Sequence, residues 1–151
     1  MSYNWKLKGL AKGINPDDAV NELTRIQALY GSITPELVVQ AAEAEGSVLH
    51  KFFEWDNTRA GQLWRIQQAR ILLNNIQITV ISDGEAREVD VYEVTSRKEG
   101  YQSIDTFTSD NIEYVKAGIV QQLNALKNKL KLYKQFDKVL EYVSQAIEAI
   151  E

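Results

Sequence analysis

The chain has 151 residues, of which 44% are hydrophobic and 25% are charged. This is the composition of one ordinary globular domain, since disordered chains are poorer in apolar residues and membrane proteins are richer. The absence of cysteine excludes disulfides and thiolate metal sites. The formal net charge of −4 argues against a non-specific coat on nucleic acid, but it leaves room for a local basic face.

Membrane association and secretion are not expected. No stretch of the sequence approaches the roughly 18 uninterrupted apolar residues that can span a bilayer. The segment from Met1 to Lys8 lacks the apolar run and the small-residue cleavage site of a signal peptide. We therefore expect a cytoplasmic protein.

The two prolines predict the starts of two helices. Asn15 precedes Pro16 and Thr34 precedes Pro35, so a good N-cap residue stands before proline at the first helical position in both places. Apolar residues follow at helical spacing, and Gly31 is placed to end the first helix.

Two further helices are predicted before residue 77. A short one extends from Ser47 to Phe53, and Asp56 is a suitable cap for a longer one. The apolar stripe of the longer helix consists of Leu63, Trp64, Ile66, Ala69, Leu72, Leu73 and Ile76.

The period of the apolar residues then changes from helical to alternating. Ile76, Ile78 and Val80 alternate with polar neighbours, and Val89 and Val91 continue the alternation after a turn at residues 82–85. The sequence Ser-Asp-Gly-Glu in that turn is typical of a tight hairpin connection. A two-stranded hairpin is predicted here.

From Thr108 onward the pattern is helical again, with Asp110 and Glu113 spaced as a capping box. Between Ile119 and Ile150, apolar residues recur every three or four positions over about four heptads. Such a stripe must be covered by the rest of the domain, by the helix folding back on itself, or by another copy. A narrow seam suits a helical partner, so a homo-oligomer built on a coiled coil is favoured.

Together these elements predict an α+β, mostly helical fold. Residues 1–108 would form a helix-turn-helix or winged-helix-like domain with the hairpin. Residues 109–151 would form a long amphipathic C-terminal helix and a candidate oligomerisation element.

No catalytic site, metal site or cofactor is predicted. His50 is the only histidine, and no serine-containing elbow motif accompanies it. The glycines make no phosphate-cradling loop. Four acids could suggest a divalent cation site, but their placement fits a solvated hairpin better; they are Asp83, Glu85, Glu88 and Asp90. The chain is therefore not expected to be an enzyme.

Residues 38–63 carry the most informative pattern. Small residues end one helix, a polar turn follows, and Leu49 and Phe53 share one face of the next helix. This is the arrangement of a helix-turn-helix, whose second helix would offer Ser47, His50 and Lys51 to a DNA major groove.

The same segment resembles the helix-turn-helix of tetracycline-repressor-like proteins. In that family, paired alanines are followed at this spacing by a leucine and a phenylalanine. The matching residues here are Ala41, Ala42, Leu49 and Phe53.

A wider resemblance covers most of residues 33–150. Four segments resemble the signature of a family of small uncharacterised phage and prophage proteins: Ile33-Thr34-Pro35-Glu36, Ser47-Val48-Leu49-His50, Phe53-Glu54-Trp55-Asp56 and Arg65-x-x-Gln68-Ala69-Arg70. That family continues with a hairpin, a glycine-tyrosine pair like Gly100-Tyr101 and a long C-terminal helix. The resemblance implies a phage setting in a bacterial host cell, and it implies no mechanism.

The leading hypothesis is a phage or prophage DNA-binding protein that acts as an oligomer on double-stranded DNA in a regulatory, packaging or genome-associated role. Four lysines at 4-3-4 spacing would share one helical face, and Arg59, Arg65 and Arg70 follow the helix after Asp56. A solvated helix surface would explain the same charges. The predicted DNA-contacting residues are Ser47, His50, Lys51, Arg59, Lys127, Lys131, Lys134 and Lys138.

The alternative is a protein-interaction module or inhibitor that docks on a host or phage protein without binding DNA. The acid-rich segment from Asp83 to Asp110 favours it, because a wing with this charge would be repelled by phosphates. Tyr3, Trp5, Trp55 and Trp64 could anchor such a partner. Trp55 and Trp64, however, stand among apolar helical positions and are expected in the core.

Overall fold

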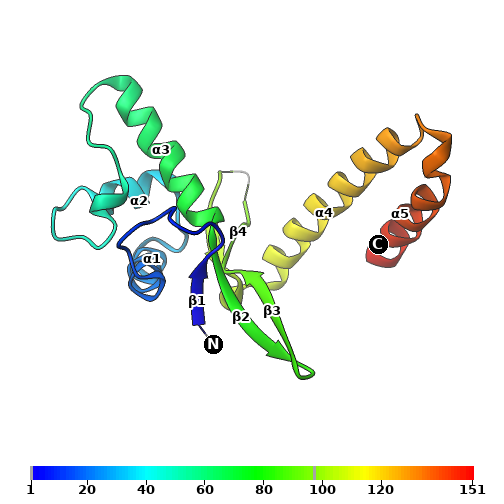
Figure 1. The fold of residues 1–151 in the computed structure, drawn as a ribbon, viewed down its shortest axis with the longest axis horizontal. Coiled ribbons are helices and arrows are strands. Elements are labelled where there is room, and N and C mark those ends of the chain that lie inside the picture. The colour runs from blue at the N-terminus through cyan, green and yellow to red at the C-terminus, as the bar shows by residue number, and fades with distance from the viewer. Residues whose placement is uncertain (1, 97) are drawn as a thin grey trace. The chain divides into compact units, whose positions relative to one another are not determined.

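The computed structural model describes residues 2–96 and 98–151. They form two compact units, Met1–Phe107 and Thr108–Glu151 (Figure 1). We call the first unit the head and the second the C-terminal hairpin, and each is described by itself. The prediction of a mainly helical α+β fold is confirmed, because helices and a small antiparallel sheet make up the chain.

The first two helices begin where the sequence predicts, and the first also ends there. In α1 (Pro16–Tyr30), the side chain of Asn15 accepts a hydrogen bond from the Asp17 backbone N–H at 2.8 Å. Gly31 ends this helix in the left-handed conformation, with φ of 80°. In α2 (Pro35–Ala42), the Thr34 side chain accepts from the Leu37 backbone N–H at 3.2 Å.

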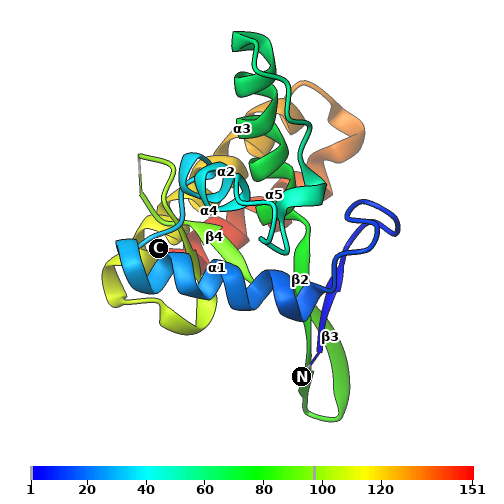
Figure 2. The same cartoon turned by 90° about the vertical axis from the view of Figure 1, so that its left-hand side faces the viewer.

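The predicted hairpin is also confirmed, and a third strand extends it (Figure 2). Strands β2 (Ile76–Ser82) and β3 (Glu85–Asp90) are antiparallel and are joined at Asp83 and Gly84, which both have positive φ, as a tight type I′ turn requires. Strand β1 (Ser2–Trp5) pairs with the other edge of β2, so the order is β1-β2-β3. The sequence analysis did not predict β1.

A second small sheet, also not predicted, follows the hairpin. Strands β4 (Tyr92–Val94) and β5 (Tyr101–Ser103) are antiparallel. Tyr101 also exchanges two backbone hydrogen bonds with Ile33, at 2.8 and 2.6 Å. These bonds tie the segment between α1 and α2 to the second sheet, and a 3₁₀ turn, η2 (Ile104–Thr106), ends the head.

Helix α3 (Arg59–Asn74) begins two residues later than expected. Thr58, not Asp56, is the N-cap, and its hydroxyl accepts from the Gly61 backbone N–H at 3.0 Å. Asp56 instead accepts from the Thr58 backbone N–H at 2.9 Å, and hydrogen bonds from Thr58 lower the pKa of the Asp56 carboxyl. The acid therefore positions the cap residue instead of capping the helix itself.

The core of the head joins α1, α2, α3 and β2. Its largest fully buried side chains are Leu23, Ile26, Ile33, Leu49, Leu72, Leu73 and Ile76. Trp55 packs against this core, but Trp64 is 44% exposed, so its predicted core position is wrong. Trp64 lies one position before the buried Arg65, which occupies the inward-facing side of α3 at that level.

The C-terminal hairpin contains the predicted long helix and a second helix that folds back along it (Figure 1). Helix α4 (Ser109–Leu130) is followed by a 3₁₀ turn, η3 (Lys134–Phe136), and by α5 (Asp137–Ile150). The apolar stripe is therefore divided between two helices, and folding back buries Val143 and Ile147 of α5. The capping box of α4 uses Thr108 and Asn111, and not Asp110 and Glu113 as predicted, because Thr108 holds the N-cap position.

Among the residues that the structure describes, none of the helices has the length and apolar character needed to cross a membrane.

Candidate functional site

The predicted recognition helix at residues 47–53 does not form. After α2 the chain makes a series of turns, and only η1 (His50–Phe52), a single 3₁₀ turn, is helical. The Ser47 hydroxyl accepts from the Leu49 backbone N–H at 3.3 Å, and the Ser47 carbonyl accepts from the His50 N–H. Such local bonds from a serine compete with an α-helix. This part of the helix-turn-helix prediction is therefore wrong.

His50 is held inside this loop. Its Nδ1 donates to the Ala42 carbonyl oxygen at 2.8 Å, and its ring stacks on Trp55 with 4.8 Å between ring centroids. The His50 carbonyl oxygen accepts from Trp55 Nε1 at 2.9 Å. Two interactions thus hold a half-buried side chain that was predicted to face DNA, and a third holds its backbone.

Arg65 and Gln68 of α3 clamp the segment that follows η1. Arg65 Nη1 donates to the carbonyl oxygens of Glu54, at 3.1 Å, and Asp56, at 2.5 Å. The guanidinium lies 5.2 Å from the ring centroid of Trp55. Gln68 donates to the Phe52 carbonyl at 3.2 Å and accepts from the Glu54 N–H at 3.2 Å. Both side chains are buried, so they satisfy backbone groups that would otherwise be unpaired.

Close backbone contact explains a glycine that the sequence analysis did not single out. A Cβ at Gly61 would lie 2.5 Å from the Asp56 carbonyl oxygen and 2.7 Å from its Cβ. Gly61 and Arg65 therefore hold the same segment from two levels of α3. Residues 53–56 and 65–68, which belong to the phage-protein signature described above, therefore form one structural unit. Their spacing in the sequence is the feature that could have indicated this unit.

Arg70, the last residue of the phage-protein signature, also has a structural role. Arg70 makes a two-pronged ion pair with Glu99, at 2.5 and 3.0 Å, and this hydrogen bonding raises the pKa of the Arg70 guanidinium. A Cβ at Gly100 would lie 2.9 Å from Ser96 Oγ. Together with the Tyr101–Ile33 pairing, these contacts hold the second sheet against α3 and the segment between α1 and α2.

The remaining predicted contacts in the head lie in mixed charge surroundings. Ser47, Lys51 and the half-buried His50 line a shallow depression together with the carboxylate-bearing Asp18 and Glu45. A phosphate that approached Lys51 there would meet both carboxylates. Arg59 is exposed at the start of α3 and does not line this depression.

The four predicted lysines do not share one helical face, because α4 ends at Leu130. Lys127 lies in the last turn of α4, Lys131 caps its end, Lys134 lies in η3 and Lys138 in the first turn of α5. With Lys129 they concentrate positive charge at the turn between the two helices, which we call the lysine tip.

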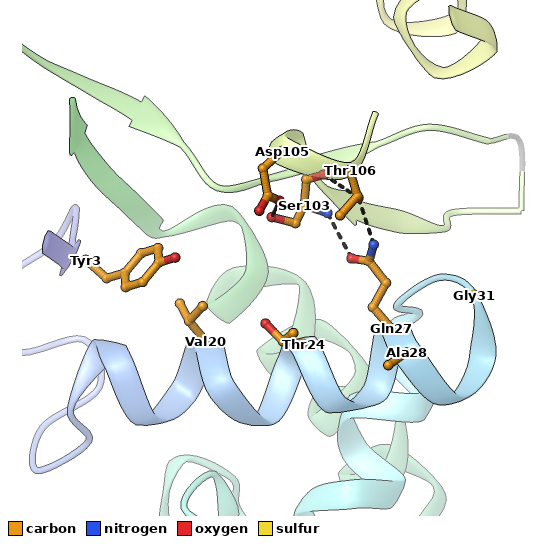
Figure 3. A pocket seen from close by; sticks show the side chains of 9 residues that line it. All are labelled: Tyr3, Val20, Thr24, Gln27, Ala28, Gly31, Ser103, Asp105 and Thr106. Carbon is orange, nitrogen blue, oxygen red and sulfur yellow. Dashed lines mark hydrogen bonds between the residues drawn. The ribbon is translucent and has the colours of Figure 1, made fainter. Parts of the chain in front are cut away.

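A second pocket lies between α1 and the chain after β5 (Figure 3). Gln27 Nε2 donates to Thr106 Oγ1 at 2.8 Å, and Gln27 Oε1 accepts from the Ser103 N–H at 3.0 Å. The Ser103 hydroxyl donates to the Asp105 carboxylate. These bonds join two parts of the head, so the polar groups of the pocket have a structural use.

The most unusual surface belongs to α4. None of its 22 described residues is buried. Ile112, Ile119 and Leu126 are 54%, 43% and 44% exposed, and they lie seven residues apart, so they follow one edge of the helix. We call these three residues the heptad edge. Residues 117–126 contain no charged side chain, so the centre of α4 resembles an interface more than a solvated face.

Among the described residues, no group of three or more His, Cys, Asp or Glu side chains is placed to hold a metal ion. No family model, curated protein or solved structure matches this chain.

Proposed function

We propose that this chain is a binding protein whose copies associate with one another through the C-terminal hairpin. Each assembly then presents more than one head. The observation that carries the proposal is the exposed heptad edge of α4. Short helices in water gain most of their stability from tertiary packing, and the hairpin buries only Val143 and Ile147. A second copy would bury the apolar residues that remain exposed.

The small size and small core of the C-terminal hairpin support association with a second copy of the chain. A 44-residue hairpin with this little core falls in the range where oligomerisation commonly supplies the missing burial. Full burial of an isoleucine or leucine contributes about 1.5–3 kcal/mol relative to exposure. Six half-exposed side chains, three from each copy, would then contribute on the order of 5–9 kcal/mol to association. Binding costs of a similar size offset most of this gain, so a weak and reversible complex is expected rather than a permanent one.

Sedimentation equilibrium of the full chain at several concentrations tests the proposal. We expect a mass that rises with concentration from the 17.2 kDa of one chain toward a multiple of it. Association should persist at high salt, because apolar contacts are not screened. A single mass of one chain at every concentration would contradict the proposal.

Nucleic-acid binding by the lysine tip is a second candidate. The observation that favours it is the gathering of Lys131, Lys134 and Lys138 beside the exposed rings of Tyr133 and Phe136. Lysines release counterions from phosphates, and aromatic rings offer stacking surfaces to bases. The resemblance to phage and prophage proteins suggests phage DNA as the ligand, in duplex form.

Fluorescence anisotropy with a short labelled duplex tests this second candidate. We expect binding at low salt with a steep salt dependence, and a log–log slope about 3 smaller for a variant with Lys131, Lys134 and Lys138 changed to alanine. A variant with Lys51 and Arg59 changed to alanine is the matched control, because it removes the predicted head contacts instead. Tighter binding to single-stranded DNA than to the duplex would identify single strands as the ligand. Absence of binding at low salt would contradict nucleic-acid binding by the lysine tip.

A further inference from the structure

The heptad edge is symmetric about its own centre. Ile112 and Leu126 each lie seven residues from Ile119. If a second α4 ran in the opposite direction with Ile119 beside Ile119, Ile112 of each copy would lie opposite Leu126 of the other. A parallel pair would instead match each residue with itself. Both arrangements cover the apolar residues, so these residues alone do not select a direction.

The charges on α4 select between them. Asp110, Glu113 and Lys116 lie in its first turns, with 3.9 Å between Lys116 Nζ and a carboxylate oxygen of Glu113. Lys127 and Lys129 lie in its last turn, and residues 117–126 between these groups are uncharged. In the antiparallel pair centred on Ile119, the end of each α4 that carries Lys127 and Lys129 lies beside the first turns of the other helix; Asp110 itself lies about 180° around the helix axis from Ile119 and does not face the lysines. In the parallel pair, Lys127 and Lys129 of one copy would lie at the level of the same lysines of the other. Like charges repel, so the antiparallel pair is favoured.

The remaining lysines of the hairpin reinforce this preference. The lysine tip extends through Lys131, Lys134 and Lys138, so most of the positive charge of the hairpin lies at the turn between α4 and α5. A parallel pair would bring the two lysine tips together, whereas an antiparallel pair keeps them at opposite ends. The helix dipoles of the two α4 helices also oppose each other in this arrangement.

We infer that two copies of this chain associate through α4 in an antiparallel pair, with a two-fold axis beside Ile119. The inference rests on the self-association proposed above and adds its direction, its register and its closure at two copies. A two-fold interface uses the same patch on both copies and leaves none of it free, so it does not continue into a filament.

Cysteine crosslinking of the full chain tests the register, and the natural absence of cysteine makes each introduced thiol unique. The single variants are Ile112→Cys, Ile119→Cys and Leu126→Cys, treated with a short bis-maleimide. Ile119→Cys is expected to crosslink with itself. Ile112→Cys and Leu126→Cys are expected to crosslink only when mixed with each other, because like positions would be about 21 Å apart along the helix axis.

Each other pattern overturns the inference in a distinguishable way. Crosslinking of Ile112→Cys and of Leu126→Cys each with itself would indicate a parallel pair. An associating chain without crosslinks at any of the three positions would indicate a different surface. Both results leave self-association standing, whereas a monomeric wild-type chain removes both proposals. All three positions are about half exposed, and sedimentation of the reduced variants checks that they still associate.

Discussion

Changing Ile119 to glutamate is expected to raise the dissociation constant of the self-associated chain by at least about 100-fold. The two-fold axis places both copies of this side chain together, so the substitution removes two apolar contacts and sets two negative charges side by side. The lost burial and the desolvation of the charges together cost about 3 kcal/mol or more. Each 1.4 kcal/mol corresponds to a factor of ten in the constant. Sedimentation equilibrium of the full chain measures the change.

Gln121→Glu is the matched control for this variant. It introduces the same charge into the same helix, but residue 121 is exposed and lies about 200° around the helix axis from Ile119. We expect its dissociation constant to stay within about threefold of the unsubstituted chain, as is usual for surface changes of under 1 kcal/mol. Equal effects of the two variants would show that the heptad edge is not the contact surface.

Arg65→Met is expected to lower the free energy of unfolding of the head by about 3 kcal/mol. The change leaves the carbonyl oxygens of Glu54 and Asp56 without their donor, at roughly 1–3 kcal/mol for an unsatisfied buried group. It also removes the cation from the face of Trp55. Urea unfolding followed by tryptophan fluorescence measures the effect, because all three tryptophans lie in the head.

Arg59→Met is the control for the loss of a positive charge from the same helix. Arg59 is exposed in the first turn of α3, so the free energy of unfolding should change by less than about 0.5 kcal/mol. Similar losses in both variants would contradict the clamping role of Arg65. If α3 contacts DNA as the sequence suggested, Arg59→Met should weaken duplex binding while leaving stability intact.

The elements with local signals were predictable from the sequence. Asn15 and Thr34 cap helices whose first N–H groups lie two or three residues away, and Asp83-Gly84 makes its turn within four residues. Ile119 and Leu126 of the heptad edge likewise belong to the apolar stripe that spacing predicted, whereas Ile112 lies before its start. In each case the interacting groups lie close together in the chain, so the local pattern contains the physical cause.

Strands β1, β4 and β5 had no comparable signal. Strand β1 forms because Tyr3 and its neighbours find β2 more than seventy residues away, and β5 is held by Ile33. A strand of three or four residues has too few positions to show a period of its own. The end of α4 at Leu130 was not predictable either, since no proline or glycine marks it.

For the candidate site, the sequence by itself determined which side chains are apolar, which are charged and at what intervals they recur. The heptad edge and the five lysines near residue 130 follow from that order. Only the tertiary structure decided that Arg65 is buried and that the half-buried His50 is held against its own loop, because their partners are two carbonyls on a separate loop and a carbonyl eight residues away. A side chain's direction depends on the contacts that the folded chain offers it, and the residue type alone does not contain that information.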